Sequence, residues 1–274
     1  MSYIRAIYNW WKVSVYAAYY GSISILFGGF SHKISQWAMW QWCKKLIVIF
    51  KIRQKWINGE KIAQAPQCIF VANHLSSLDI LVLGSFIQQD YRWLAKSVLF
   101  KIPFSGWHLS LSGHIPVFRG KQKYKNKALP KRIHKVVEEG ASLLFFPEGS
   151  RSADGELHSF HLGAFRAAVE ESLPILPLVI RDTDKLMKKN AIDRSLNFED
   201  ECSVTVLDLI YPSDLDQSMQ EKISSLQQKV YDVMYEEFYE QSEYLQKSPK
   251  YLQNNVNISS FQSSIDTNTS QSFQ

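Results

Sequence analysis

The residues with the clearest potential for chemistry are His74 and Asp79, which lie five positions apart between two apolar runs. Five residues at ~100° each give ~500° of rotation, so the two side chains would point ~140° apart on a regular helix. We therefore expect His74 on a turn and Asp79 at or just inside the start of the next helix. There the carboxylate accepts one ring N–H and leaves the other ring nitrogen free to take a proton, as in a general base.

A purely structural interpretation of the same segment is also open. Asp79 would cap the helix, the two serines before it would form the turn, and His74 would be a solvated loop side chain. The spacing alone does not decide, because His134 and Glu139 share it within a predicted surface helix. The assignment of a base therefore depends on the rest of the chain.

Two further segments place charged side chains directly after predicted strands. Residues 113–120 bring Arg119 to the end of an Ile-Pro-Val strand, and a guanidinium matches the oxygens of a phosphate. Residues 143–152 form an apolar strand that ends in a Pro-Glu-Gly-Ser-Arg turn with Glu148 and Arg151. Ligands bind at strand ends in α/β proteins. In isolation, a surface arginine and an ion pair in a turn would explain these segments equally well.

Apolar runs alternate with amphipathic stretches from about residue 52 to residue 240. The predicted strands are residues 52–57, 67–72, 91–95, 114–118, 141–146, 174–180 and 203–209. The predicted helices are residues 79–88, 105–112, 123–139, 163–172 and 214–240. This alternation is typical of a sheet with helices packed on it, so we predict an α/β fold with a mixed sheet flanked by helices.

The N-terminal segment, residues 1–51, has no acidic residue and is rich in aromatic and basic ones. Residues 13–31 carry no charge over nearly the ~20 residues that span a bilayer. Tryptophans and lysines follow on a helical pattern, which is typical of the lipid headgroup layer. We expect membrane-associating helices, either spanning or interfacial; a pair of buried core helices is the alternative. Residues 52–240 would form one domain, and the polar tail 241–274 would be disordered.

The charge distribution indicates an anionic partner. The net charge is +5, and no acidic residue lies between Asp90 and Glu138 in a stretch full of lysine and arginine. Nucleic acid, an anionic bilayer and a phosphorylated substrate all fit this asymmetry. The three cysteines are scattered, which argues against a disulfide framework or a paired metal-ligand spacing.

Four blocks in this order resemble the glycerolipid acyltransferase family, whose best-known members are the 1-acyl-glycerol-3-phosphate acyltransferases. The blocks are Asn-His-Leu-Ser-Ser-Leu-Asp at 73–79, Arg119 after its Ile-Pro-Val strand, Phe-Pro-Glu-Gly-Ser-Arg-Ser at 146–152, and Leu-Pro-Ile-Leu-Pro-Leu at 173–178. They cover roughly residues 60–185. The resemblance implies an O-acyltransferase of phospholipid biosynthesis that converts lysophosphatidic acid to phosphatidic acid.

The resemblance also implies roles for single residues. His74 would remove the proton from the acceptor hydroxyl, and Asp79 would orient its ring and stabilise the imidazolium. Arg119 and Arg151 would hold the acceptor phosphate, and Glu148 would position the acceptor. The remaining substrate-binding candidates are Gly149, Ser150 and Lys96.

Substrates, partners and location follow from the same resemblance. Acyl-CoA or acyl-carrier protein would be the co-substrate, with no cofactor and no metal. Membrane phospholipids and a lysophospholipid acceptor would be partners, and nucleic acid would not. A cytosolic donor requires a membrane-bound enzyme whose active domain faces the cytoplasm.

The chain departs from the family pattern at two places. Phe118 precedes Arg119, where an acidic or polar residue is common. A Phe-Lys-Lys-Gly-Ala sequence usually follows the third block, whereas this chain has His161 and Leu162 in place of the two lysines. Lys96 and the basic run 121–135 could compensate for the missing charge.

Three other functions remain open. The departures allow a family member that acylates another lysolipid or lipid head group. The basic and aromatic surface would also serve a non-catalytic membrane- or nucleic-acid-binding protein, although no recognised nucleic-acid-binding signature is present. A serine hydrolase could use Ser150, but the Gly-x-Ser-x-Gly turn is absent.

Overall fold

The structure is a computed structural model that describes residues 2–28, 31–187, 201–212 and 218–240. Residues 1–234 form one compact unit, and residues 235–274 are grouped apart from it. The predicted tail 241–274 lies outside the described residues.

A mixed sheet is the centre of the first unit, as the sequence predicted. Its order is β1-β7-β6-β2-β5-β3-β4, in which β6 and β7 are antiparallel and all other neighbours are parallel. The strands are β1 (Arg53–Ile57), β2 (Ile69–Ala72), β3 (Tyr91–Lys96), β4 (Ile115–Val117), β5 (Ser142–Phe145), β6 (Ile175–Arg181) and β7 (Glu201–Val206). Each one falls on a predicted strand. Every residue of β2 and β5 is buried, as expected for parallel strands that are covered on both faces.

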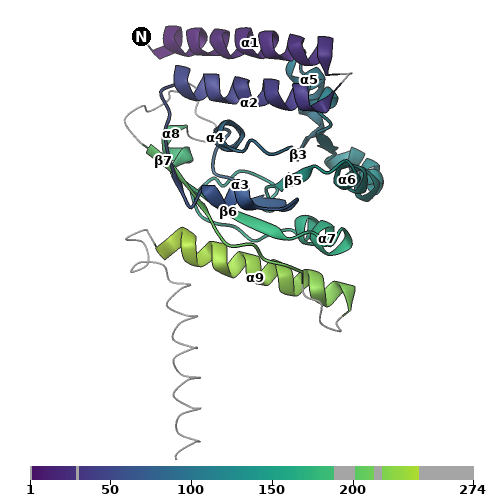
Figure 1. The fold of residues 1–274 in the computed structure, drawn as a ribbon. Helices are drawn as coiled ribbons and strands as arrows, with labels where there is room; N and C mark the ends of the chain where they lie inside the picture. The colour runs from purple at the N-terminus through teal and green to yellow at the C-terminus, as the bar shows by residue number, and fades with distance from the viewer. Residues whose placement is uncertain (1, 29–30, 188–200, 213–217, 241–274) are drawn as a thin grey trace, which may run out of the picture. The chain divides into compact units, whose positions relative to one another are not determined.

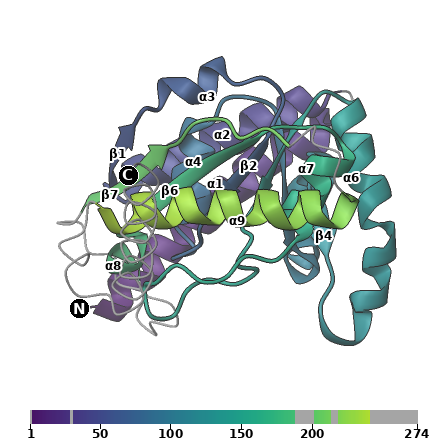
Figure 2. The ribbon, with the colours of Figure 1, turned by 90° about the horizontal axis from the view of Figure 1, so that it is seen from below.

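Helices cover both faces of this sheet (Figure 1). They are α1 (Ser2–Phe27), α2 (His32–Ile49), α3 (Glu60–Gln64), α4 (Asp79–Phe86), α5 (Ser105–Leu111), α6 (Leu129–Glu138), α7 (Gly163–Glu170), α8 (Thr183–Leu186) and α9 (Met219–Glu240), with 3₁₀ segments η1 (Ser97–Lys101) and η2 (Gly120–Ala128). On one face α4 is covered by α2, and α2 by α1. The residues of α9 up to Met234 cross the strands on the other face (Figure 2).

The predicted helix 123–139 is wrong over its first part. Residues Gly120–Ala128 form the 3₁₀ segment η2, and the α-helix begins only at Leu129. Pro130 explains the boundary, because proline lacks the N–H that a helix interior needs and fits the first turn instead.

The two N-terminal helices are packed differently. One side of α2 is part of the hydrophobic core, with Met39, Cys43 and Leu46 buried. The predicted boundary at residue 52 therefore marks a change in sequence pattern only, because the buried side of α2 belongs to the same hydrophobic core as the sheet. The outer face of α1 exposes large apolar side chains, including Trp11 and Leu26. Among the described residues, no helix has the length and apolarity needed to cross a bilayer.

Candidate active site

The loop between β2 and α4 brings His74 and Asp79 together in the predicted geometry. Asp79 is the first residue of α4, and its Oδ2 lies 2.7 Å from Nδ1 of His74. The backbone N–H groups of Leu75 and Ser76 donate to the same oxygen at 2.8 and 2.9 Å. An ionised carboxylate only accepts, so Nδ1 carries the proton and Nε2 has a lone pair to act as a base.

Asp79 is fully buried, yet its charge is well hydrogen-bonded. The hydroxyl of Thr183 donates to Oδ1 at 2.5 Å, in addition to the three donors on Oδ2. Hydrogen bonds to the charged form are what allow a carboxylate to stay ionised away from water. The arrangement can therefore stabilise an imidazolium on His74 after proton transfer.

The turn after β5 holds the backbone of His74 from both sides. Oε1 of Glu148 accepts the N–H of His74 at 2.8 Å, and the N–H of Ser152 donates to the carbonyl of His74 at 2.7 Å. The ring of His74 stacks on Phe146 with centroids 4.1 Å apart. Contacts to backbone and ring together leave the imidazole little freedom to turn.

Glu148 lies behind the site and does not line its cavity. Its side chain is buried, and its second oxygen accepts the N–H of His158 at 3.3 Å. Burial raises the pKa of Glu148 to about 7, against the two backbone N–H groups that favour its charged form. The carboxylate therefore holds two loops of the protein together, and its role in positioning the acceptor stays a prediction.

A cavity of about 390 Å³ lies in front of His74 and gathers most of the predicted site. Its polar wall contains His74, Lys96, Arg119, Gly149, Ser150, Arg151 and His161. Arg119 donates to the carbonyl of Gly149, and Arg151 donates to Oγ of Ser77 at 2.7 Å. Lys96 thus lines the cavity, whereas no lysine of the run 121–135 is among its lining residues.

The backbone at Gly149 makes room for His161. Gly149 has φ +70°, a left-handed conformation that favours glycine. A Cβ there would lie 3.0 Å from Cδ2 of His161. His161 is held in place by its own N–H, which donates to the carbonyl of Pro147 at 2.9 Å. The ring that replaces a lysine of the family pattern therefore belongs to the cavity wall.

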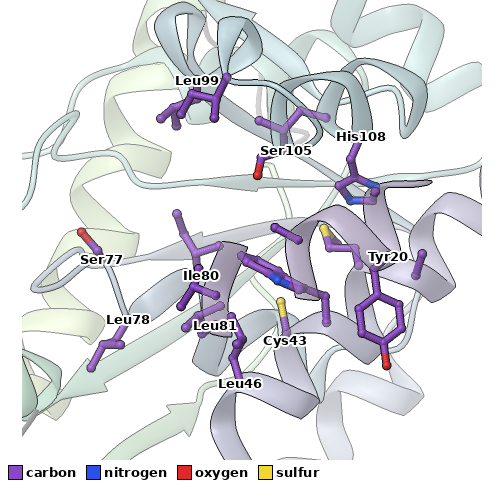
Figure 3. Close-up of a pocket in the computed structure, with 18 of the residues that line it drawn as sticks. Tyr20, Cys43, Leu46, Ser77, Leu78, Ile80, Leu81, Leu99, Ser105 and His108 are labelled. Atoms are coloured by element: carbon purple, nitrogen blue, oxygen red, sulfur yellow. The ribbon is translucent and has the colours of Figure 1, made fainter. Parts of the chain in front are cut away.

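A second cavity of about 270 Å³ is lined mostly by apolar side chains from α1, α2, α4, η1 and α5 (Figure 3). It shares Ser77, Ile80, Trp93 and Leu99 with the first, so the two cavities adjoin. Ser77 and Leu78 lie at one end in Figure 3, and His108 lies toward the other. Burial lowers the pKa of His108 to about 4, so this ring is neutral near pH 7.

Some of these residues were not expected from the sequence. Thr183 begins a helix of four residues, and Trp93 reads as an ordinary strand residue. Neither lies in a recognisable pattern, because their roles depend on contacts between distant segments. His161 was noticed only as a departure from the family pattern, which placed it after the third block but gave no position in the fold.

Comparisons with known proteins show what this chain is similar to. Residues 54–181 match the family model described as Acyltransferase. A chloroplastic 1-acyl-sn-glycerol-3-phosphate acyltransferase of Brassica napus is 41% identical over 120 residues, which cover 44% of this chain and 34% of that protein. The 1-acyl-sn-glycerol-3-phosphate acyltransferase of Saccharomyces cerevisiae is 32% identical over 184 residues, covering 66% of this chain and 58% of that protein.

A solved structure shows the same fold. The crystal structure of the 1-acyl-sn-glycerophosphate acyltransferase of Thermotoga maritima matches with a TM-score of 0.72, covering 88% of this chain and 97% of that one. At 22% identity this likeness concerns the fold alone. The matched stretch spans about a third of the Brassica relative and over half of the yeast relative.

Proposed function

We propose that this chain is an acyltransferase of the family whose model matches residues 54–181. It would move a fatty acyl group from acyl-CoA or acyl-carrier protein to the free hydroxyl of 1-acylglycerol-3-phosphate. The product would be phosphatidic acid. One observation carries the proposal: the His74–Asp79 pair faces a cavity with cationic side chains, and that cavity adjoins an apolar one.

His74 acts as the general base in this mechanism. Nε2 takes the proton of the acceptor hydroxyl while the hydroxyl oxygen attacks the carbonyl carbon of the thioester. The C–S bond breaks, the ester forms, and the proton is passed to the departing thiolate. A positioned base contributes ~10²–10⁴-fold to such a reaction, because an alcohol is a poor nucleophile near pH 7.

The acceptor's phosphate is the ligand of the cationic wall. A guanidinium has five N–H donors, so the bond from Arg119 to the Gly149 carbonyl uses one of them. Arg119, Arg151 and Lys96 come from three separate segments and line the same cavity as His74. Binding the phosphate there holds the neighbouring hydroxyl beside the base, which reduces the entropy cost of reaction.

The apolar cavity is the place for an acyl chain in this proposal. Its lining includes Met39, Leu46 and Leu81, and it opens toward the reacting groups through residues shared with the first cavity. Each methylene that leaves water for such a site gains ~0.8 kcal/mol. A chain anchored there would bring its carboxyl end close to His74.

We place the chain at a membrane, with its active domain on the cytoplasmic side. Exposed apolar and aromatic side chains on α1 support this placement: Ile7, Tyr8, Trp11, Val15, Tyr19, Leu26 and Phe27. The ammonium of Lys12 lies 4.1 Å from the Tyr8 ring centroid, so a cation accompanies the aromatic surface. Aromatic rings and lysines together favour the headgroup layer of a bilayer. A cytosolic acyl donor sets the orientation.

The test uses purified protein in detergent with acyl-CoA and a panel of lysophospholipids, following thiol release. Release that requires lysophosphatidic acid and disappears in His74→Ala supports the proposal. His134→Ala is the matched control, because His134 also pairs with a carboxylate, Glu171, but on an exposed surface.

The other outcomes separate the alternatives. If thiol is released with another acceptor and not with lysophosphatidic acid, the mechanism stands but the substrate is different, and His161 is the first residue to test for acceptor choice. Activity with acyl-carrier protein alone settles the donor. No release with either donor and any acceptor overturns the proposal and favours a binding protein, and release that survives in His74→Ala overturns the base.

A further inference from the structure

A buried hydroxyl stands directly behind the catalytic pair. Thr183 is fully buried, and its Oγ1 donates to Oδ1 of Asp79 across 104 positions of sequence. None of the four sequence blocks contains it.

The chain is bent to bring Thr183 to this place. Strand β6 ends at Arg181, and Asp182 then adopts φ +67°, a left-handed conformation that is uncommon outside glycine. The carbonyl of Asp182 accepts the N–H groups of Lys185 and Leu186, so α8 starts immediately after the bend. Backbone conformations of this kind cost free energy and persist where neighbouring contacts fix them.

Two further contacts fasten the same segment to the His74 loop. The side-chain amide of Asn73 pairs with both backbone groups of Ile180, at 2.8 and 2.7 Å. Oγ of Ser76 donates to the carbonyl of Met187 at 2.9 Å. Thr183 therefore lies between two anchors, and its hydroxyl is held at a fixed position relative to Asp79.

The two carboxylate oxygens of Asp79 have unequal surroundings. Oδ2 takes His74 and two backbone N–H groups, while Thr183 is the one donor to Oδ1 within the described part of the chain. Without that hydroxyl, Oδ1 would be a buried acceptor with no partner, a state that proteins avoid by rotating the group or admitting water. Rotation would turn the carboxylate away from Nδ1 of His74, and a water in place of the hydroxyl would exchange a donor that is fixed to the chain for a mobile one.

We propose that Thr183 is a positioning residue for the acyl transfer, which it serves by locking the Asp79 carboxylate in the rotation that orients His74. The inference rests on the proposed function for its effect on turnover. It concerns the geometry of the pair itself, so it is also testable without substrate. Thr183 contacts no substrate and acts through Asp79.

The kinetic test compares Thr183→Val, Thr183→Ser and Thr205→Val. Valine removes the hydroxyl at almost constant volume, and serine keeps it. Thr205 is a matched control, since it is also buried and its hydroxyl accepts from the side chain of Arg181 instead of donating to Asp79. We expect kcat to fall about 10–100-fold in Thr183→Val with KM unchanged, by analogy with metal sites, where losing a group that orients a ligating side chain costs this much. Thr183→Ser should restore most of kcat, and Thr205→Val should leave it unchanged.

A spectroscopic test distinguishes this inference from the proposed function. The proton on Nδ1 of His74 gives an NMR resonance that reports its bond to Asp79, and it is assigned by its loss in His74→Ala. We expect Thr183→Val to shift or broaden this resonance while Thr205→Val leaves it in place. An unchanged resonance in Thr183→Val overturns the inference, as does an unchanged kcat in an active protein. Wild-type protein that is inactive with every donor and acceptor overturns the proposed function, and the resonance still decides the role of Thr183.

Discussion

Replacing Glu148 with glutamine is predicted to remove a pH-dependent loss of stability. Burial raises the pKa of Glu148 from 4.5 to about 7, so the folded protein holds this proton more tightly than the unfolded chain does. The stability that the neutral carboxyl contributes is fully present below pH ~4.5 and is lost as the pH rises through ~7. Glutamine does not titrate, so Glu148→Gln lacks this pH dependence.

The size of the effect follows from the two pKa values. At ~1.4 kcal/mol per pKa unit, the wild type loses about 3–4 kcal/mol of unfolding free energy over the whole range, most of it between pH 5 and pH 8. An amide has one acceptor oxygen, so the glutamine side chain keeps one of the two backbone N–H partners of Glu148 and leaves the other unpaired. That change costs about 1–3 kcal/mol at every pH and does not alter the slope.

Urea unfolding at several pH values between 5 and 8 measures the difference between the two proteins. Other titrating groups are common to both and cancel in the comparison. We expect the stability advantage of the wild type over Glu148→Gln to shrink by about 2–3 kcal/mol as the pH rises. An advantage that stays constant, or grows, refutes the reasoning that burial of this carboxyl dominates its titration.

Three further predictions concern the cavities. Arg119→Gln should raise the KM for lysophosphatidic acid about 10-fold or more, because a charge-assisted bond to phosphate contributes ~1.5–3 kcal/mol. The KM for the acyl donor should stay the same. Steady-state kinetics with each substrate varied in turn measure both constants, and a joint rise would contradict the prediction. Gly149→Ala should destabilise the fold by about 1–2 kcal/mol, because an L-residue is strained at a left-handed φ. It should also raise the acceptor KM, because the new Cβ presses on His161. Gly140→Ala, with φ +80° and open space around it, should show the stability loss alone. Ala17→Leu narrows the apolar cavity and should shift the preferred acyl-CoA to shorter chains in a competition assay, so an unchanged chain-length profile would remove the acyl chain from that cavity.

Strands such as β2 and β5 were predictable because each is a short apolar run, whereas β1 is largely polar and carries a weaker signal. A continuous run such as Ile69–Ala72 requires cover on both faces, and the helices around it were expected from their own periodicity. The wrong start of α6 had a visible warning in Pro130, which marks a first turn. The strand order and the reversed β6–β7 pair depend on which strands meet in space, so no local pattern contains them.

The pairing of His74 with Asp79 was predictable from their residue types together with the motif blocks that follow them, since the spacing alone also fits His134 and Glu139. The residues that hold this pair in place were not predictable from the sequence. The backbone contacts of Glu148 were not predictable, because they form only where two loops that are distant in sequence meet around its side chain. Thr183 gives no signal at all, because a single threonine in a four-residue helix becomes important only through a contact with Asp79.

The central claim is that His74 drives acyl transfer to a lipid hydroxyl, and the most direct test measures both products of the reaction. Wild type and His74→Ala are incubated with lysophosphatidic acid and acyl-CoA, and phosphatidic acid is quantified by mass spectrometry beside the free thiol. We predict one phosphatidic acid for each thiol released by the wild type, and loss of both in His74→Ala. Thiol release without phosphatidic acid, or phosphatidic acid formed equally well by His74→Ala, would contradict the account.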